Sequence, residues 1–380
     1  MNIVTDFEQI QEQMHSVDPV KYGKTRNYID GAVTYLSPYI SRGVISTKQV
    51  LLSVFKKGYK PYQVEKFIQE LAWRDYFQRV WQAKGDAVWQ ALKQEQPDVQ
   101  HHHMPHAVET GTTGIEAVDA LINRLFETGY MHNHMRMYTA SITCNIGKAH
   151  WKLPAQWMYY HLLDGDIASN NCSWQWVAGA FSSKKYYCNQ ENINKYTHSN
   201  QRNTFLDRSY EDLPGMPVPE TLLQTSVPVL HTLLPETTLP VLDPALPVLL
   251  YNSYNLDPLW RIGQDANRIL VLEPSHFQNN PVRKKVIDFI IALSANIKGI
   301  QLYCGEVNDL VEFVSSASQN KNPVFISKEH PAFMHYPGSK DERDWMFPQV
   351  TGYYNSFFAY WKKCERYLKN YNEPNLFSAV

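Results

Sequence analysis

The sequence DGDIASNNCSWQW at residues 164–176 is the part of the chain richest in information about fold and function. Two acids, two asparagines and two tryptophans fall within these thirteen residues, at the end of a helical pattern. Taken alone, Asp-Gly-Asp followed by Ser-Asn-Asn is typical of a turn and a helix cap, and tryptophan is usually a core residue. The segment indicates a functional site only in combination with other parts of the chain.

Three upstream segments supply that combination. They are VTYLSPYIS at 33–41, ELAWRDYF at 70–77 and TGYMHNHMRM at 128–137. Together with residues 164–176, they resemble the flavin-binding domain of the DNA photolyase and cryptochrome family in order and in spacing. The resemblance covers roughly residues 20–210 and implies an all-helical domain that binds FAD in a U-shape.

The resemblance assigns cofactor-binding residues position by position. Residues 34–37 match the segment that holds the FAD diphosphate, where a turn leads into a helix. Arg136 matches the arginine near flavin N5 that pairs with Asp164, and Asp166 matches the acid near N3 and O2. Asn170 matches the residue that faces N5, where a neutral amide fits a site for reduced anionic flavin. The matched cofactor-binding residues are Tyr22, Thr34, Leu36, Ser37, Arg74, Arg136, Asp164, Asp166 and Asn170.

The resemblance also implies an electron-transfer chain of tryptophans. Trp174 matches the member next to the flavin, and Trp151, thirteen residues before Asp164, matches the second member. The indole ring suits this role because it is oxidisable and large enough to keep hops short. Residues 99–107, where the third member is expected, contain no tryptophan. The third member could be Trp157, Tyr159, Tyr160 or a residue of another domain.

A further group of matched residues faces the substrate. Glu70 and Trp73 match the acid and the aromatic ring that contact a flipped pyrimidine dimer, and Trp176 matches a second aromatic wall. A damaged base pair stacks poorly, so extruding it costs less than extruding an intact pair. A helix face with one core tryptophan and one solvated acid is the alternative for Glu70 and Trp73. The matched substrate and DNA contacts are Arg26, Glu70, Trp73, Asn133, His134, Met137 and Trp176, and the matched catalytic residues are Glu70, Trp151, Asn170 and Trp174.

Two positions depart from the family pattern. His134 stands where enzymes for cyclobutane dimers usually have a phosphate-binding arginine, and residues 172–173 are Cys-Ser in place of Gly-Gly. The histidine should weaken binding to DNA, although Arg26 matches another phosphate-binding residue. A histidine pair in this neighbourhood is typical of 6-4 photolyases and animal cryptochromes, but Asn133 and Met137 flank this site. The balance favours cyclobutane dimers.

The whole sequence predicts an α plus α/β protein. Apolar spacings of three and four predict a helical domain over residues 1–210. Residues 211–247 contain eight of the 22 prolines and cannot sustain a helix or a central strand, so we expect a connector that lies against the surface. Residues 248–380 alternate apolar runs with helical patterns and end in an aromatic-rich helix, which predicts a small parallel-sheet, Rossmann-like domain. The expected strands lie at 248–253, 268–274, 299–305 and 323–329.

This domain order is unusual for the family. Photolyases normally begin with an α/β antenna domain, whereas here the antenna-like part comes last, as in a circular permutation. An antenna domain in residues 248–380 would hold a second, antenna chromophore, whose presence and identity the sequence leaves open. A generic α/β interaction domain is the alternative, because no glycine-rich phosphate fingerprint follows any expected strand.

The composition of the chain bears on where a polyanion binds, on the state of the cysteines and on the location of the protein. Residues 1–210 carry 22 basic and 19 acidic side chains against 14 and 18 in residues 211–380, so a polyanion should bind the first part through a local patch. The five cysteines lack CxxC spacing, and we expect reduced thiols and no metal. The sequence shows neither a signal peptide nor an apolar run of membrane-spanning length, so we expect a soluble, cytoplasmic protein that is monomeric.

The resemblance implies a deoxyribodipyrimidine photolyase, a carbon–carbon lyase. In such an enzyme, light drives an electron from reduced FAD to a flipped cyclobutane pyrimidine dimer in single- or double-stranded DNA. A cryptochrome-like photoreceptor without repair activity is the first alternative, favoured by His134 and by the modest basic excess. A flavoprotein or DNA-binding module that works without light is the second.

Overall fold

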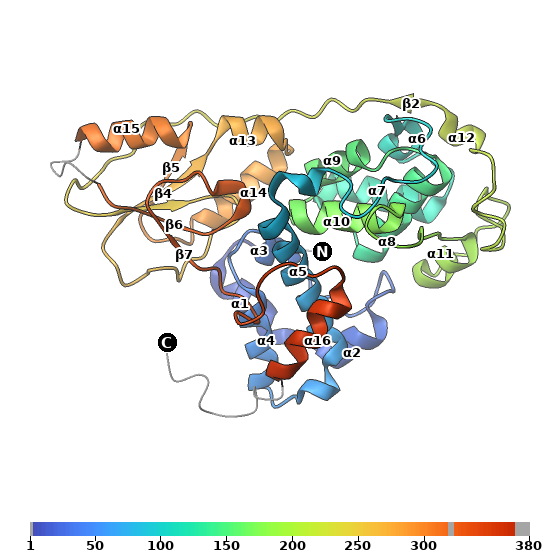
Figure 1. Ribbon diagram of the computed structural model, residues 1–380, viewed down its shortest axis with the longest axis horizontal. Helices are drawn as coiled ribbons and strands as arrows, with labels where there is room; N and C mark the ends of the chain where they lie inside the picture. The colour runs from blue at the N-terminus through green and yellow to red at the C-terminus, as the bar shows by residue number, and fades with distance from the viewer. Residues whose placement is uncertain (1–2, 318–322, 369–380) are drawn as a thin grey trace.

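The computed structural model describes residues 3–317 and 323–368, which form a helical part and an α/β part joined by a long connector (Figure 1). Residues 3–210 are mainly helical, in line with the prediction from the sequence. Within them, residues 131–163 form α8, a π-helical turn and α9. Its helices are α1 (Phe7–Ser16), α2 (Pro19–Thr25), α3 (Ser37–Ser41), α4 (Thr47–Lys56), α5 (Glu65–Lys84), α6 (His106–Thr110), α7 (Glu116–Thr128), α8 (Asn133–Ala140), α9 (Lys152–His161), α10 (Ile167–Ala178) and α11 (Gln190–Thr197). Shorter elements are η1 (Pro61–Gln63), η2 (Gly85–Trp89), the π-helical turn η3 (Ser141–Ile146) and β1 (Met104–Pro105).

Local sequence determines where these helices begin and end. Ser46 and Gln49 form a capping box at the start of α4, in which Ser46 Oγ accepts from Gln49 N at 3.0 Å and Gln49 Oε1 accepts from Ser46 N at 2.9 Å. Asp166 caps α10, and Gly179 ends it with a φ of 82°, a left-handed conformation that glycine adopts readily. Because Asp166 is also a candidate flavin ligand, the cap of α10 positions part of the site.

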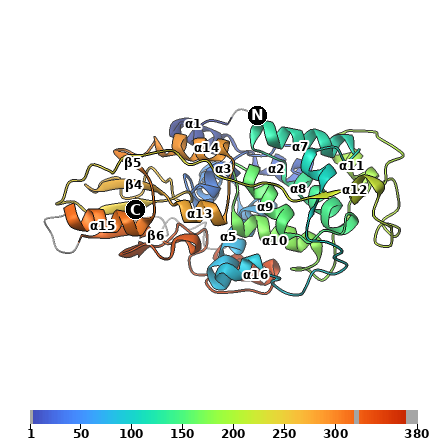
Figure 2. The same cartoon turned by 90° about the horizontal axis from the view of Figure 1, so that it is seen from above.

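A five-stranded parallel sheet forms the α/β part, with the strand order β5-β4-β3-β6-β7. Val248 pairs with Asn267 on one side and with Phe325 on the other, so β3 lies at the centre. Figure 2 shows α14 and α15 on opposite faces of the sheet, which explains why β3 is buried along its whole length. The elements are β3 (Val248–Tyr251), β4 (Asn267–Leu272), α13 (Pro274–Asn279), α14 (Lys284–Ser294), β5 (Ile300–Cys304), α15 (Val307–Ala317), β6 (Phe325–Lys328), η4 (Pro331–Phe333) and β7 (Ser339–Asp341).

The four strands expected from the sequence are confirmed as β3 to β6. Strand β7 was not expected, because its three residues, Ser-Lys-Asp, carry no apolar signal and pair only at the sheet edge. The order of the strands reverses between β3 and β6, so the carboxyl ends of these two strands border a crevice.

The connector, residues 211–247, runs along the helical part and then along the sheet (Figure 1). It contains one helical turn, α12 (Glu220–Leu223), and a two-residue strand, β2 (Thr225–Ser226), that pairs with β1. Further along, Thr237 Oγ1 accepts from Cys304 N at 2.8 Å. The segment therefore lies against the surface as expected, while the short turn and edge strand were not expected.

The last helix, α16 (Phe357–Leu368), corrects the expectation that residues 248–380 form one α/β domain closed by a helix. It packs on α5 of the helical part, where the Phe357 ring stacks on Trp73 with centroids 3.9 Å apart and Tyr360 lies 5.8 Å from Tyr76 (Figure 1). The chain thus crosses back from β7 to the helical part, and residues 369–380 of the expected domain lie outside the described residues.

Candidate functional site

One cavity in the helical part gathers residues from α5, α8, α9 and α10. These helices are separate in sequence, but each turns at least one side chain toward the same space. Eight of the residues assigned from the sequence line this cavity: Arg74, Asn133, Arg136, Met137, Asp164, Asp166, Asn170 and Trp174. Residues from three of the four sequence motifs, at 70–77, 128–137 and 164–176, therefore line the same cavity.

Arg136 and Asp164 form the ion pair that the resemblance implies. Arg136 Nη2 donates to both carboxylate oxygens of Asp164 at 2.9 Å, and Arg136 Nε donates to Met131 O at 2.8 Å. Burial alone raises the pKa of Asp164, but the Arg136 guanidinium and a hydrogen bond from Ser37 outweigh it, so the pKa lies below its usual value. Asp164 is therefore a carboxylate at neutral pH, and it fixes the orientation of Arg136.

Asp166 and Asn170 are held at the start of α10. Asp166 Oδ1 accepts from Ser169 N at 2.7 Å, and Asp166 Oδ2 accepts from Gln78 Nε2 at 2.5 Å. Asn170 Nδ2 donates to Ala155 O at 2.9 Å, which fixes the plane of its amide. Both side chains line the cavity in defined orientations, as a ligand-binding site requires.

The donor set of the cavity fits FAD. Arg74 can supply positive charge to a diphosphate, while Arg136, the acids and the amide can face the polar edge of a flavin ring. Ser169 Oγ is buried and has no hydrogen-bond partner within residues 3–317 and 323–368, so it has a donor and an acceptor position available to a ligand. Such an orphaned hydroxyl is costly unless a bound group satisfies it.

The segment of residues 34–37 approaches the cavity from its margin. Tyr35 has a φ of 53°, which is uncommon for a residue with a side chain and turns the chain sharply into α3. Gln13 Nε2 holds this turn by donating to Thr34 O at 2.9 Å. Thr34, Leu36 and Ser37 do not line the cavity, and Ser37 reaches it only through Asp164.

Tyr22 lies near the same margin. Burial, followed by the charge of Glu70, raises its pKa well above the usual value, while Arg26 and Arg74 act in the opposite direction. Its ring packs edge-on against Phe67 of α5, with centroids 5.1 Å apart. The phosphate-side role of Tyr22 stays a prediction.

The two matched tryptophans of the electron-transfer chain are buried. Trp174 lines the cavity, whereas Trp151 does not and is fully enclosed. The ring of His150 lies beside that of Trp151, with centroids 5.7 Å apart. The route from Trp174 through Trp151, and the choice of a third member, stay predictions.

On the substrate side, other side chains already contact Glu70 and Trp73. Glu70 Oε1 accepts from Arg26 Nε at 3.3 Å and from Lys66 Nζ at 3.1 Å, so two cations already engage this carboxylate. One face of Trp73 is covered by Phe357, as described above. Trp176 is 39% exposed and free to contact a partner on its outer side.

His134 is partly buried and is engaged by two tyrosines of the helical part. Its Nε2 lies 2.8 Å from Tyr138 Oη, and its ring lies 4.7 Å from that of Tyr196. Burial, with the nearby charge of Arg26, lowers its pKa to about 4, so the ring is neutral at pH 7. A neutral ring agrees with the expectation that His134 holds DNA less firmly than an arginine would, and its place among the DNA contacts stays a prediction.

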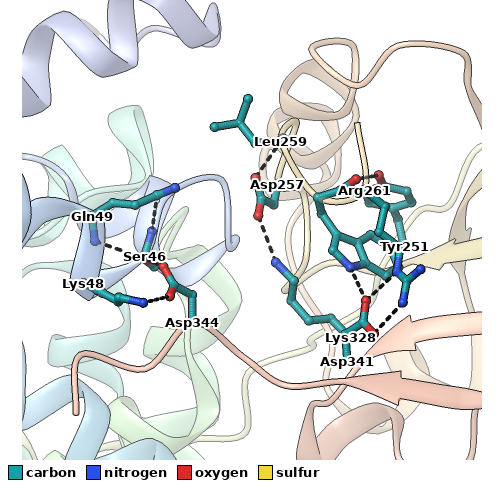
Figure 3. Close-up of polar contacts among 11 residues, drawn as sticks. Ser46, Lys48, Gln49, Tyr251, Asp257, Leu259, Arg261, Lys328, Asp341 and Asp344 are labelled. Carbon is teal, nitrogen blue, oxygen red and sulfur yellow. Dashed lines mark hydrogen bonds and ion pairs between the residues drawn. The ribbon is translucent and has the colours of Figure 1, made fainter. Parts of the chain in front are cut away.

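A second cavity lies between the two parts of the molecule and was not foreseen. Asn255 and Asp257 follow β3, while Lys328 ends β6, so these residues stand at the carboxyl ends of the central strands. Figure 3 shows Asp257 and Lys328 in contact there. Arg74 and Asp166 line this cavity as well as the first one. The signal that could have located it is the run of polar residues that follows each central strand.

The described residues also limit two other possibilities. Within them, no group of three or more His, Cys, Asp or Glu side chains is placed to hold a metal ion. None of the helices in residues 3–317 and 323–368 has the length and apolar character needed to cross a membrane.

Residues 67–217 match the family model for the FAD binding domain of DNA photolyase. These residues therefore form a domain similar to that FAD binding domain. It is 33% identical over 165 residues to a deoxyribodipyrimidine photo-lyase of Streptomyces griseus, a match that covers 41% of this chain and 36% of that protein. It is also 33% identical over 177 residues to a cryptochrome DASH of Danio rerio, covering 42% and 32% respectively.

The chain spans about a third of the length of these relatives. A solved cryptochrome of Synechocystis sp. aligns with 24% identity and a TM-score of 0.45, over 52% of this chain and 44% of that one. The family match covers residues 67–217, and the parallel sheet of the α/β part lies outside this range.

Proposed function

We propose that this protein binds FAD in the cavity of the helical part and repairs cyclobutane pyrimidine dimers in DNA under blue light. The observation that carries this proposal is the convergence of the Arg136–Asp164 pair, Asp166 and Asn170 on one cavity. When bound, reduced FAD supplies the light-excited electron that opens the cyclobutane ring and is recovered afterwards. The remaining chemistry falls to the side chains of the chain.

The residues of the cavity divide this work between charge and orientation. Arg136, fixed by Asp164, presents a positive charge beside the flavin edge and favours its anionic form. Asn170 offers an amide at the position matched to N5, and Ser169 offers a free hydroxyl. Arg74 faces the diphosphate side.

The substrate enters in this proposal beside Asn133 and Met137. Asn133 is exposed at the start of α8, and both residues line the cavity, so a flipped dimer meets them before it reaches the flavin. Trp176 provides an exposed aromatic surface nearby for stacking. Extrusion selects damaged bases, because they are already poorly stacked.

A second chromophore is proposed for the cavity between the two parts. Asn255 is 2% exposed, and neither atom of its amide group has a hydrogen-bond partner within the described chain. A planar molecule with paired donor and acceptor groups on one edge would satisfy both atoms. Lys328, paired with Asp257 at 2.9 Å, adds charge on the same side (Figure 3). Because Arg74 and Asp166 line both cavities, a chromophore there lies beside the flavin.

A photoreceptor without repair activity is the second candidate function. Two observations favour it: Phe357 covers one face of Trp73, and His134 is neutral and turned inward. Both reduce the means of holding a lesion without affecting the flavin cavity.

The deciding experiment is repair of a cyclobutane dimer in a defined oligonucleotide. The full chain would be loaded with FAD, reduced chemically and illuminated with blue light, with a dark control and a 6-4 lesion in parallel. We expect dimer loss in the light only. Protein that carries FAD but repairs neither lesion would contradict the repair function and support the photoreceptor.

A further inference from the structure

A residue from the α/β part is connected to the flavin cavity of the helical part through two hydrogen bonds. Arg343 lies just after β7, and its Nη1 donates to Gln78 Oε1 on α5 at 2.5 Å. Gln78 Nε2 in turn donates to Asp166 Oδ2 at 2.5 Å. One glutamine amide therefore connects an arginine of one part to a cavity-lining carboxylate of the other.

Arg343 itself is held firmly. Its Nε donates to Glu329 Oε2 at 2.8 Å, and its guanidinium lies 4.3 Å from the centre of the Trp345 ring. The guanidinium of Arg79 lies 3.6 Å from the centre of the same ring, so two arginines contact Trp345. These contacts fix a positive charge at a partly buried site, where screening by water is weaker than at the surface.

The amide of Gln78 has a defined orientation because its two ends have different partners. Its oxygen must face the cation of Arg343, and its nitrogen must face the carboxylate of Asp166. A cation on the acceptor end polarises the amide and strengthens donation from the other end. Without Arg343, the amide could rotate and present its oxygen to Asp166, which would repel it.

We propose that Arg343 is a positioning residue for the flavin, acting through Gln78 and Asp166. This inference rests on the proposed binding of FAD, with Asp166 on the N3 and O2 side of the ring. The relay holds the carboxylate in place and offsets part of its negative charge. A reduced anionic flavin is therefore stabilised, and the α/β part tunes the redox chemistry of the helical part.

The test compares the midpoint potential and absorption spectrum of bound FAD in matched variants. Arg343→Met removes the charge, Gln78→Leu breaks the relay while keeping Arg343, and Arg343→Lys keeps the charge without the planar fork. The control is Arg261→Met, because Arg261 pairs with Asp341 at 2.6 Å within the α/β part and lines neither cavity (Figure 3).

We expect Arg343→Met and Gln78→Leu each to disfavour reduction about tenfold, which is about 30 mV more negative for a two-electron couple. Arg343→Lys should lie between them and the wild type, and Arg261→Met should leave the potential unchanged. The double variant should shift no further than either single variant, because both remove the same relay. If Arg343→Met does not fold, Gln78→Leu and Arg343→Lys carry the same expectation.

The outcomes separate this inference from the proposed function. Variants that bind FAD stoichiometrically but keep the wild-type potential and spectrum would overturn the relay alone. Wild-type protein that binds no FAD would contradict the proposed function and, with it, the relay.

Discussion

The flavin cavity and the substrate wall belong to the same helical domain, yet their side chains are arranged very differently. In the cavity, Arg136 and Asp164 meet as a buried pair and leave ligand-facing groups available. At the wall, Glu70 is engaged by two cations and Trp73 is covered by Phe357. The comparison shows that a motif can place its residues correctly while distant elements decide whether those residues are open.

The difference follows from where the partners come from. The side-chain hydrogen-bond partners of Arg136 and Asn170 lie within residues 131–171, close to them in sequence. The partner of Trp73 comes from α16, at the far end of the described chain. A comparison of the two regions can therefore be tested by removing one partner at a time.

The largest effect is expected from Arg136→Met. Asp164 would then be a buried carboxylate without its cation, and breaking such a pair costs about 3–5 kcal/mol. We expect loss of FAD together with a lower free energy of unfolding, measured by denaturant titration and by the flavin content of purified protein. Full FAD occupancy in this variant would contradict the assigned role of the pair.

A smaller effect, confined to the other region, is expected from Phe357→Ala. Removing a buried ring costs about 3 kcal/mol, and it also uncovers one face of Trp73. We expect tighter binding of an oligonucleotide with a cyclobutane dimer, measured by fluorescence anisotropy, with FAD retained. Phe358→Ala is the matched control, because the neighbouring ring is 68% exposed. Equal affinities in the two variants would place Phe357 on the rear face of Trp73.

His134 gives a pH-dependent test of the substrate side. Its pKa is lowered to about 4 in the folded protein, below the unfolded value near 6.5, so the folded state binds fewer protons between these values. Its contribution to stability is present above pH 6.5 and is lost as the pH falls toward 4. Allowing for partial exposure, we expect a loss of about 1–2 kcal/mol over this range, which His134→Asn should reduce.

The measurement is the free energy of unfolding from pH 7 to 4 for wild type and variant. His103→Asn, at an exposed histidine, serves as the control. A wild-type slope that persists in His134→Asn would assign the pH dependence to other groups.

The smallest effect on stability is expected from Glu70→Gln. The ion pairs to Arg26 and Lys66 are partly exposed, and such pairs contribute about 0–1 kcal/mol. If Glu70 contacts the lesion, repair should fall several-fold while FAD content and unfolding stay close to wild type. An unchanged repair rate would remove Glu70 from the substrate pocket and leave it as a surface ion-pair partner.

The sequence by itself determined those features that depend on local patterns. Helical periodicity and the cap at Asp166 define α10, and alternating apolar runs define β3 to β6. The Arg136–Asp164 pair was assigned through the resemblance of its two motifs to the family, and the structure shows the two side chains in contact.

Only the tertiary structure decided the contacts between distant segments. Gln78 and Arg343 are 265 residues apart, and neither has a sequence pattern that indicates the other. The stacking of Phe357 on Trp73 and the orphaned amide of Asn255 likewise arise from the docking of the two parts. Periodicity reports which face of an element is buried, whereas the identity of the surface that covers this face depends on how complete elements pack together.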